Sequence, residues 1–215
     1  MAELIDIYDA NLKRFGTAER LAAHLNGEWH QTFHMWIASS LHGGSLIFQL
    51  RAPDAKNYPN LLDITAAGHL QAGEDVSHGV REVIEELGIQ VSYDQLKPLG
   101  YRVEVADQAN GQRNREYQNV FLVRDDRKAA EFKPDPAEVY GLLYVPISQG
   151  MELFTGRRTE VVAEGIAFDK KKGSWLPTTD TLSKDRFLPR IQQYYLTMLI
   201  MAERLLEGKD VIAIS

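Results

Sequence analysis

The chain has 215 residues, 44% hydrophobic and 25% charged, which is enough for one well-packed soluble domain. Its net charge of −6 argues against a general nucleic-acid-binding protein, since such proteins concentrate lysine and arginine. It contains no cysteine, which excludes disulfides and thiolate metal sites and fits a reducing compartment. No run of about 18 apolar residues and no signal-peptide pattern is present, so we expect a cytoplasmic protein without a membrane span.

The first part of the chain alternates strand-like runs with turns. We predict a strand at Leu4–Tyr8, a helix at Thr17–Leu25 with Thr17 as its N-cap, and strands at Gln31–Ser39 and Ser45–Arg51 joined as a hairpin by Leu41–Gly44. The most clearly helical stretch follows at Asp75–Leu87, with Gly88 placed to end it. The centre of the chain predicts three more strands, at Leu99–Ala106, Tyr117–Arg124 and Val139–Pro146.

Beyond Gly150 the pattern changes. We predict a strand at Glu160–Phe168, a basic turn at Lys170–Gly173, and a long helix with Pro189 in its first turn that ends near Gly208. The apolar stripe of this helix favours packing against its own domain over a dimer surface. We therefore expect an α/β domain over residues 1–148 and a C-terminal strand-plus-helix extension, residues 149–215, packed on the same domain.

Three carboxylates gather on one turn of the predicted helix Asp75–Leu87. Spacings of three and four residues bring Glu82, Glu85 and Glu86 together. Arg81 can pair with Glu85, but one cation cannot balance three anions. A hard divalent cation can, because Mg²⁺ prefers oxygen ligands and bridges carboxylates to substrate phosphates. For such a helix taken alone, a solvated acidic face is the alternative interpretation.

The residues around this helix complete a longer motif. Gly68–Ile89 reads G-H-L-Q-A-G-E-D-V-S-H-G-V-R-E-V-I-E-E-L-G-I. It resembles the Nudix box, which is written as G, five residues, E, seven residues, R-E-U-x-E-E-x-G-U, with U aliphatic. The second half matches at every fixed position, and Gly68 and Glu74 match the first half, but six residues instead of seven separate Glu74 from Arg81. By chance these positions would match on the order of 10⁻⁹ times per starting point.

The resemblance implies a Nudix α/β/α sandwich, a mixed sheet between helices, and hydrolysis of a diphosphate linkage. It implies that Glu82, Glu85 and Glu86 hold the metal, Mg²⁺ or Mn²⁺ in its place, and that Arg81 orients a carboxylate. The metal would neutralise charge on the diphosphate and activate or orient a water for attack at phosphorus. We assign Glu82, Glu85 and Arg81 to the catalytic set.

The resemblance extends upstream to isopentenyl-diphosphate isomerases and their hydrolase relatives. It rests on Trp29–Phe33, Leu46–Arg51, Lys56, Pro59 and Ala67–His69, which occur in the order of that branch. In the isomerases the residues that match Arg51, Lys56 and Arg81 contact the diphosphate, and we count Arg51, Lys56 and Gly68 as substrate-binding candidates. A cysteine that performs the proton transfer stands in the isomerases where this chain has Ala67, so hydrolysis is favoured over isomerisation.

Acidic and histidine residues outside the box are further candidates. A later acidic residue often assists in this family, and Glu138 is our candidate with Glu116 as its rival. His24, His30 and His69 resemble in order a histidine metal cluster of the isomerases. We favour structural roles for His24 and His30 over a second metal, and we place His69 and Glu116 among the substrate-binding residues.

The sequence therefore predicts a Mg²⁺-dependent Nudix pyrophosphohydrolase that acts on a small-molecule diphosphate, either a nucleoside diphosphate linked to another group or a prenyl diphosphate. The alternatives are an isomerase-like enzyme and a non-catalytic diphosphate sensor. We expect no nucleic-acid or membrane partner. The sequence leaves open whether the chain forms a homodimer.

Overall fold

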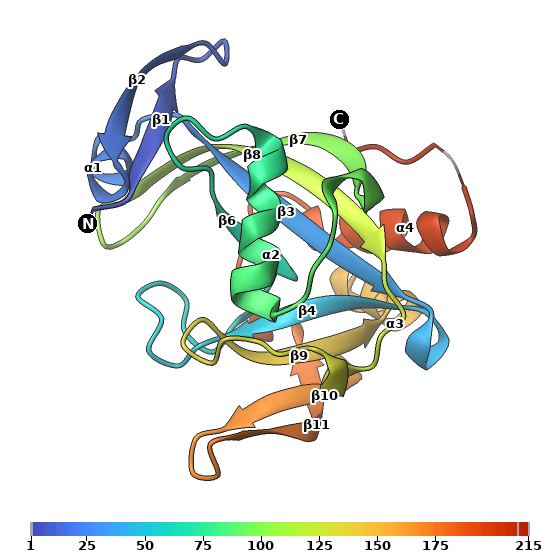
Figure 1. Cartoon of the computed structure of the whole chain (residues 1–215). Coiled ribbons are helices and arrows are strands. Elements are labelled where there is room, and N and C mark those ends of the chain that lie inside the picture. Colours follow the sequence, from blue (N-terminus) through green and yellow to red (C-terminus); the bar gives the residue numbers. More distant parts are fainter. Residues whose placement is uncertain (1, 210, 215) are drawn as a thin grey trace.

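A mixed nine-stranded sheet forms the centre of the computed structural model, which describes residues 2–209 and 211–214 (Figure 1). Its strands are β3 (His30–Ser39), β4 (Ser45–Arg51), β5 (Leu62–Asp63), β6 (Ala66–His69), β7 (Lys97–Asp107), β8 (Arg113–Arg124), β9 (Val139–Pro146), β10 (Glu160–Asp169) and β11 (Ser174–Ser183). The main order is β11-β10-β9-β4-β3-β8-β7, with β5 on β4 and β6 on β3. Only β3 and β8 pair in parallel among these described strands.

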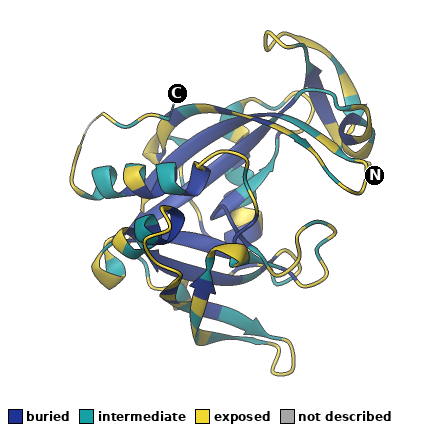
Figure 2. Cartoon of the chain, turned by 180° about the vertical axis from the view of Figure 1, so that it is seen from behind, coloured by how far each residue is buried: buried dark blue, intermediate teal, exposed yellow. Residues whose placement is uncertain are grey.

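Helices cover both faces of this sheet. Helix α2 (Val80–Leu87) lies on one face, and helices α3 (Ile147–Phe154) and α4 (Tyr194–Leu206) lie on the other, as the two opposite views show (Figures 1 and 2). Alternation along β3 serves both layers: Met35 and Ile37 join the core under α2, whereas Trp36 and Ala38 join the core under α3 and α4. The predicted α/β/α sandwich is confirmed.

A small N-terminal lobe stands beside the main sheet. Strands β1 (Leu4–Tyr8) and β2 (Arg14–Glu19) form a two-stranded sheet, and helix α1 (Arg20–Asn26) packs on it. The helix predicted from Thr17 therefore starts too early, and Thr17 is not its cap. Thr17 instead pairs with Asp6 in the antiparallel ladder, where a β-branched residue fits well.

Helix α2 begins later than predicted. Asp75 caps a 3₁₀ turn, Val76–Gly79, by accepting a hydrogen bond from the Ser77 N–H at 2.8 Å, and the α-helix proper starts at Val80. The turn lies close to the sheet, since a Cβ on Gly79 would be 2.4 Å from the Phe33 ring. Gly88 ends the helix in the left-handed conformation, as predicted.

The C-terminal part adds two strands and two helices. The predicted strand at residues 160–168 is present as β10, whereas α3 and β11 were not predicted. The prediction that Pro189 opens the last helix is wrong, because α4 begins at Tyr194. The Leu188 N–H donates to the Leu62 carbonyl at 2.9 Å, which holds this stretch in an extended connection.

The last helix packs on its own chain, as its apolar stripe indicated. Tyr194, Tyr195, Met198, Leu199 and Ala202 are buried in the core shared with the main sheet. Among the described residues, no helix combines the length and apolar character that crossing a bilayer requires.

Candidate active site

A cavity of about 1260 Å³ opens beside β3 and β6, between the N-terminal lobe, the β7–β8 hairpin and the stretch before α4. It is lined by seven of the residues predicted from the sequence: Arg51, Lys56, Gly68, His69, Glu86, Glu116 and Glu138. The other three, Arg81, Glu82 and Glu85, lie on α2 next to it. The fold thus collects the predicted site residues from separate parts of the chain around one region.

Two of the box glutamates turn inward from α2. Glu86 is buried and accepts a hydrogen bond from the Ala67 N–H at 3.0 Å. The Glu82 side chain is 13% exposed and lies against Gly68, where an added Cβ would be 2.0 Å from the Glu82 carboxylate carbon. Gly68 therefore makes room for a carboxylate at the base of β6.

Burial changes the protonation chemistry of both carboxyl groups. It raises the pKa of Glu82 to about 7, with Arg81 opposing the shift and Glu85 and Glu138 adding to it. It also raises the pKa of Glu86 well above its ordinary value, although the Ala67 N–H opposes the shift. Two neighbouring carboxylates are thus held where their charge is poorly compensated by the protein alone.

Arg81 and Glu85 occupy the outer side of the same turn. Arg81 lies 2.9 Å from Glu85, 3.0 Å from Glu82 and 3.3 Å from Glu74, and the Glu85 side chain is 54% exposed. The shorter first half of the box therefore still brings Glu74 to Arg81. A 3₁₀ turn rises about 2.0 Å per residue against about 1.5 Å in an α-helix, so fewer residues cover the distance.

The donor set on α2 fits a divalent cation. Hard cations such as Mg²⁺ take oxygen ligands and would supply the positive charge that the half-buried Glu82 and the buried Glu86 lack. Glu85 points into solvent with Arg81, and the oxygens of the three glutamates do not form a tight ligand group among the described residues. A cation that also binds substrate oxygens and waters does not require such a group.

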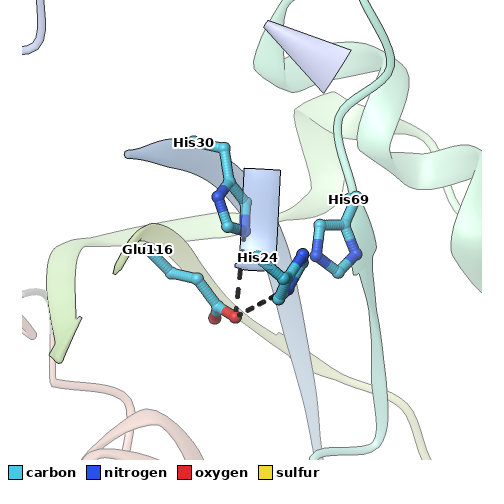
Figure 3. Close-up of side chains that lie close together, drawn as sticks. All are labelled: His24, His30, His69 and Glu116. Carbon is cyan, nitrogen blue, oxygen red and sulfur yellow. Dashed lines mark ion pairs between the residues drawn. The ribbon is translucent and has the colours of Figure 1, made fainter. Parts of the chain in front are cut away.

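A second cluster of polar side chains, His24, His30, His69 and Glu116, also lines the cavity or lies next to it (Figure 3). The ligand atoms of His24, His30, His69 and Glu116 all lie within 4.8 Å of one another. The Nε2 atoms of His24 and His30 are each 4.0 Å from the same Glu116 oxygen, which is too long for a hydrogen bond. These three histidines come from α1, β3 and β6, and Glu116 comes from β8.

Backbone contacts define how these imidazoles face each other. The Nδ1 atoms of His24 and His30 lie 2.8 Å from the Arg20 and Glu28 carbonyls, which can only accept, so Nδ1 carries the proton. In the neutral ring Nε2 then presents a lone pair. The buried Nε2 atoms of His30 and His69 have no hydrogen-bond partner among the described residues. Burial lowers the pKa of both rings, most strongly for His69, which favours the neutral form.

This geometry fits a second divalent cation better than the purely structural role that we favoured for His24 and His30. Three imidazole lone pairs and one carboxylate converge, as in sites for borderline metals. The clustering also places Glu116 with the histidines and away from the box glutamates. Strand register explains it, because His30 pairs with Glu116 across β3 and β8.

Glu138 and Arg51 line the same cavity. Glu138 is exposed on the loop before β9, and its charge adds to the pKa increases of Glu82 and Glu86. Arg51 donates to the Asn57 carbonyl at 3.2 Å and has a nitrogen 4.0 Å from Asp63. Lys56, on the loop after β4, is exposed at the cavity wall.

Three further residues of the cavity were missed in the sequence: Asp63, Gln118 and Arg190. The Gln118 amide donates to Glu116 at 2.7 Å, and it faces inward because it is two residues further along β8. The alternation of polar residues along β8 could have identified Gln118 from the sequence. Arg190 contacts Asp63 at 2.6 Å across 127 residues of sequence, and no local pattern marks such a pair.

A sandwich of this kind, with a glutamate-bearing helix beside a polar cavity, is the arrangement that the resemblance implied, and relatives identify the family. An uncharacterized Nudix hydrolase of Clostridium acetobutylicum is 30% identical over 92% of this chain and 95% of its own length. An isopentenyl-diphosphate Δ-isomerase of Streptomyces coelicolor is 33% identical over 67% of this chain and 71% of its own. The chain therefore belongs to the Nudix hydrolase family and is an enzyme.

Solved structures agree on the fold. The Deinococcus radiodurans protein DR0079 superposes with a TM-score of 0.55 at 21% identity, over 72% of this chain and 90% of that one. A Nudix hydrolase from Alicyclobacillus acidocaldarius superposes with a TM-score of 0.54 at 11% identity, over 86% of this chain and 97% of its own. No protein-family model matches the chain.

Proposed function

We propose that this enzyme hydrolyses the diphosphate linkage of a small organic diphosphate with the help of Mg²⁺, or Mn²⁺ in its place. The observation that carries the proposal is a pair of neighbouring carboxylates, the half-buried Glu82 and the buried Glu86, held beside the cavity with raised pKa values. A bound divalent cation would neutralise the diphosphate and activate or orient a water.

The residues of the chain would divide the remaining work. Glu82 and Glu86 would bind the cation from the protein side, and Glu85 would supply a carboxylate oxygen from the solvent side. Arg81 keeps Glu82 and Glu85 in position through its two short contacts. Arg51 and Lys56, which line the cavity, would bind phosphate oxygens.

Glu138 is the candidate for a general base from outside the box. It lines the cavity and is close enough to the box carboxylates to influence their pKa values. A general base must reach the proton that it removes, directly or through one water. Glu116 is less suited to this role, since it lies among the three histidines.

The histidine cluster supports a second divalent cation in the proposed enzyme. His24, His30, His69 and Glu116 would hold it with three imidazole nitrogens and one carboxylate oxygen. His30→Ala should remove one equivalent of bound metal per chain, measured by elemental analysis after dialysis against limiting cation. His78→Ala changes an exposed histidine outside the cluster and should leave the metal content unchanged. Equal metal content in both variants would exclude the second site.

An isomerase is supported less well than a hydrolase. Position 67, which holds the proton-transferring cysteine in the isomerases, carries alanine, and its N–H donates to Glu86. An acidic pair completes the histidine cluster of the isomerases, and in the matching region, Glu116–Asn119, Glu116 alone is acidic. A diphosphate sensor would need no catalytic carboxylates, so the intact box argues against that role.

The decisive experiment measures phosphate release from nucleoside and prenyl diphosphates with Mg²⁺ and with chelator. Glu82→Gln, Glu85→Gln and Glu86→Gln should each lower the rate by roughly 10²-fold or more. Glu207→Gln, an exposed change beyond α4, should leave it unaltered. Mg²⁺-dependent binding without release would support the sensor, and double-bond migration without release would support the isomerase.

A further inference from the structure

The floor of the cavity beyond Glu86 is built from buried polar side chains. Along β3, the side chains on this face change from the apolar Trp36 to the polar His34 and Thr32. On the neighbouring strand β8, the residues that pair with them change from Leu122 to Gln118. The side chains concerned, all lining the cavity, are Thr32, Gln49, Asp63, Glu104, Gln118 and Arg190. The first five are each at most 6% exposed. A cavity for a purely apolar group would not place polar side chains here, because burying them without partners is costly.

The charges on this floor balance one another. Arg190 donates to Asp63 at 2.6 Å and lies 3.7 Å from Glu104, and Asp63 also accepts from the Tyr195 hydroxyl at 3.1 Å. Glu104 is further paired with Arg102. A second phosphate or carboxylate would meet these two acidic groups, so the floor does not favour another anion.

Several groups on the floor keep hydrogen-bonding capacity. Thr32 Oγ1 is buried without a partner, and Gln49 makes no side-chain hydrogen bond to any described residue. Trp36 Nε1 donates to the Tyr194 hydroxyl at 3.0 Å, so that hydroxyl can donate to His34 Nδ1 at 3.2 Å. The neutral His34 ring then carries its proton on Nε2 and offers a donor.

The larger aliphatic side chains of the cavity divide between its mouth and its interior. Leu21, Val105 and Ile191 are 54%, 50% and 80% exposed, whereas Ile64 and Leu188 are 1% and 8% exposed. Among the described lining residues other than histidine, Tyr58 is the one aromatic side chain, and it is 37% exposed on the loop between β4 and β5. Among the described residues, two buried aliphatic side chains do not make an apolar channel for a prenyl chain, and no aromatic platform for a base extends to the floor.

We propose that the cavity selects a diphosphate whose organic group carries several hydroxyls, such as a sugar or polyol, with Thr32 and Gln49 as specificity-determining residues. This inference rests on the proposed function and names its substrate class. A hydroxyl both donates and accepts, so it can satisfy the Gln49 amide and the Thr32 hydroxyl while touching the Asp63–Arg190 pair. A hydrocarbon group would leave these buried groups unpaired, and sites built in this way reject such analogues by up to about 10⁴-fold.

The test compares two five-carbon substrates, ribitol 5-diphosphate and isopentenyl diphosphate, with a nucleoside diphosphate as reference. The wild type should hydrolyse the polyol compound with a kcat/KM at least 10²-fold higher than the prenyl compound. The double variant Thr32→Val/Gln49→Leu should lower this ratio at least tenfold by slowing polyol hydrolysis alone. Gln90→Leu, an exposed glutamine outside the cavity, is the matched control.

The outcomes separate this inference from the function on which it rests. Preferred hydrolysis of the prenyl compound would overturn the hydroxylated class, and preferred hydrolysis of the nucleoside compound would overturn the exclusion of a stacked base. Both outcomes would leave the hydrolase intact. An unchanged ratio in the double variant, with urea unfolding showing that it is folded, would overturn the roles of Thr32 and Gln49. Hydrolysis of none of the three compounds with Mg²⁺ would defeat the proposed function itself.

Discussion

Removing the Glu82 charge should stabilise the protein when divalent cations are absent. The side chain is 13% exposed, and burial raises its pKa from 4.5 to about 7. A carboxyl group with a raised pKa in the folded state contributes fully to stability below pH 4.5, and this contribution is lost as the pH rises through 7. A shift of about 2.5 units corresponds to about 3 kcal/mol, so Glu82→Gln should gain about that much at pH 8.

Chelator-treated protein gives the direct measurement. Glu82→Gln should raise the melting temperature at pH 8 by about 6–12 °C, given about 2–4 °C per kcal/mol for a chain of this size. At pH 4 the two proteins should melt together. Addition of Mg²⁺ should stabilise the wild type by mass action and leave the variant unchanged. Glu207→Gln, an exposed carboxylate, is the control that should change neither profile.

Two results would refute this reasoning. A variant no more stable than the wild type at pH 8 would mean that burial does not disfavour the ionised form of Glu82. An equal gain at pH 4 and pH 8 would mean that packing, rather than ionisation, causes the difference.

Two further changes test the neighbourhood of the site. Gly68→Ala would place a Cβ 2.0 Å from the Glu82 carboxylate carbon, so hydrolysis with Mg²⁺ should fall by about 10²-fold while circular dichroism stays native. Gly16→Ala meets only ordinary contacts and should keep full activity; equal rates for both would contradict the role of Gly68. Arg190→Ala should lower the free energy of unfolding by about 3–5 kcal/mol in urea, since Asp63 stays buried without its closest partner, and a loss below about 1 kcal/mol would contradict this.

Sequence patterns predicted those parts of the fold that interactions between residues close in sequence determine. The box residues form α2 because their periodicity and the end at Gly88 agree with each other. Strand β9 matches its predicted bounds for the same reason. Burial was harder to predict, because Glu82 and Glu86 face the sheet while Glu85 faces solvent, and sequence spacing alone places all three together.

Long-range contacts account for the predictions that failed. Thr17 has the composition of a helix cap, but pairing with Asp6 makes it part of a strand. Pro189 suits the first turn of a helix, but the ion pair between Arg190 and Asp63 ties this stretch to β5, and the helix begins only at Tyr194. Such contacts join residues far apart in sequence, so no local window contains both partners.

The tie between Asp63 and Arg190 also has a consequence for the order of synthesis. Translation produces the box helix and both sets of proposed metal ligands long before Arg190, which follows Asp63 by 127 residues. Until then one wall of the cavity is absent and Asp63 lacks its closest counter-charge. A nascent or truncated chain that stops short of Arg190 would carry its acidic helix without this wall of the cavity, so the proposed selectivity would depend on completion of the C-terminal stretch.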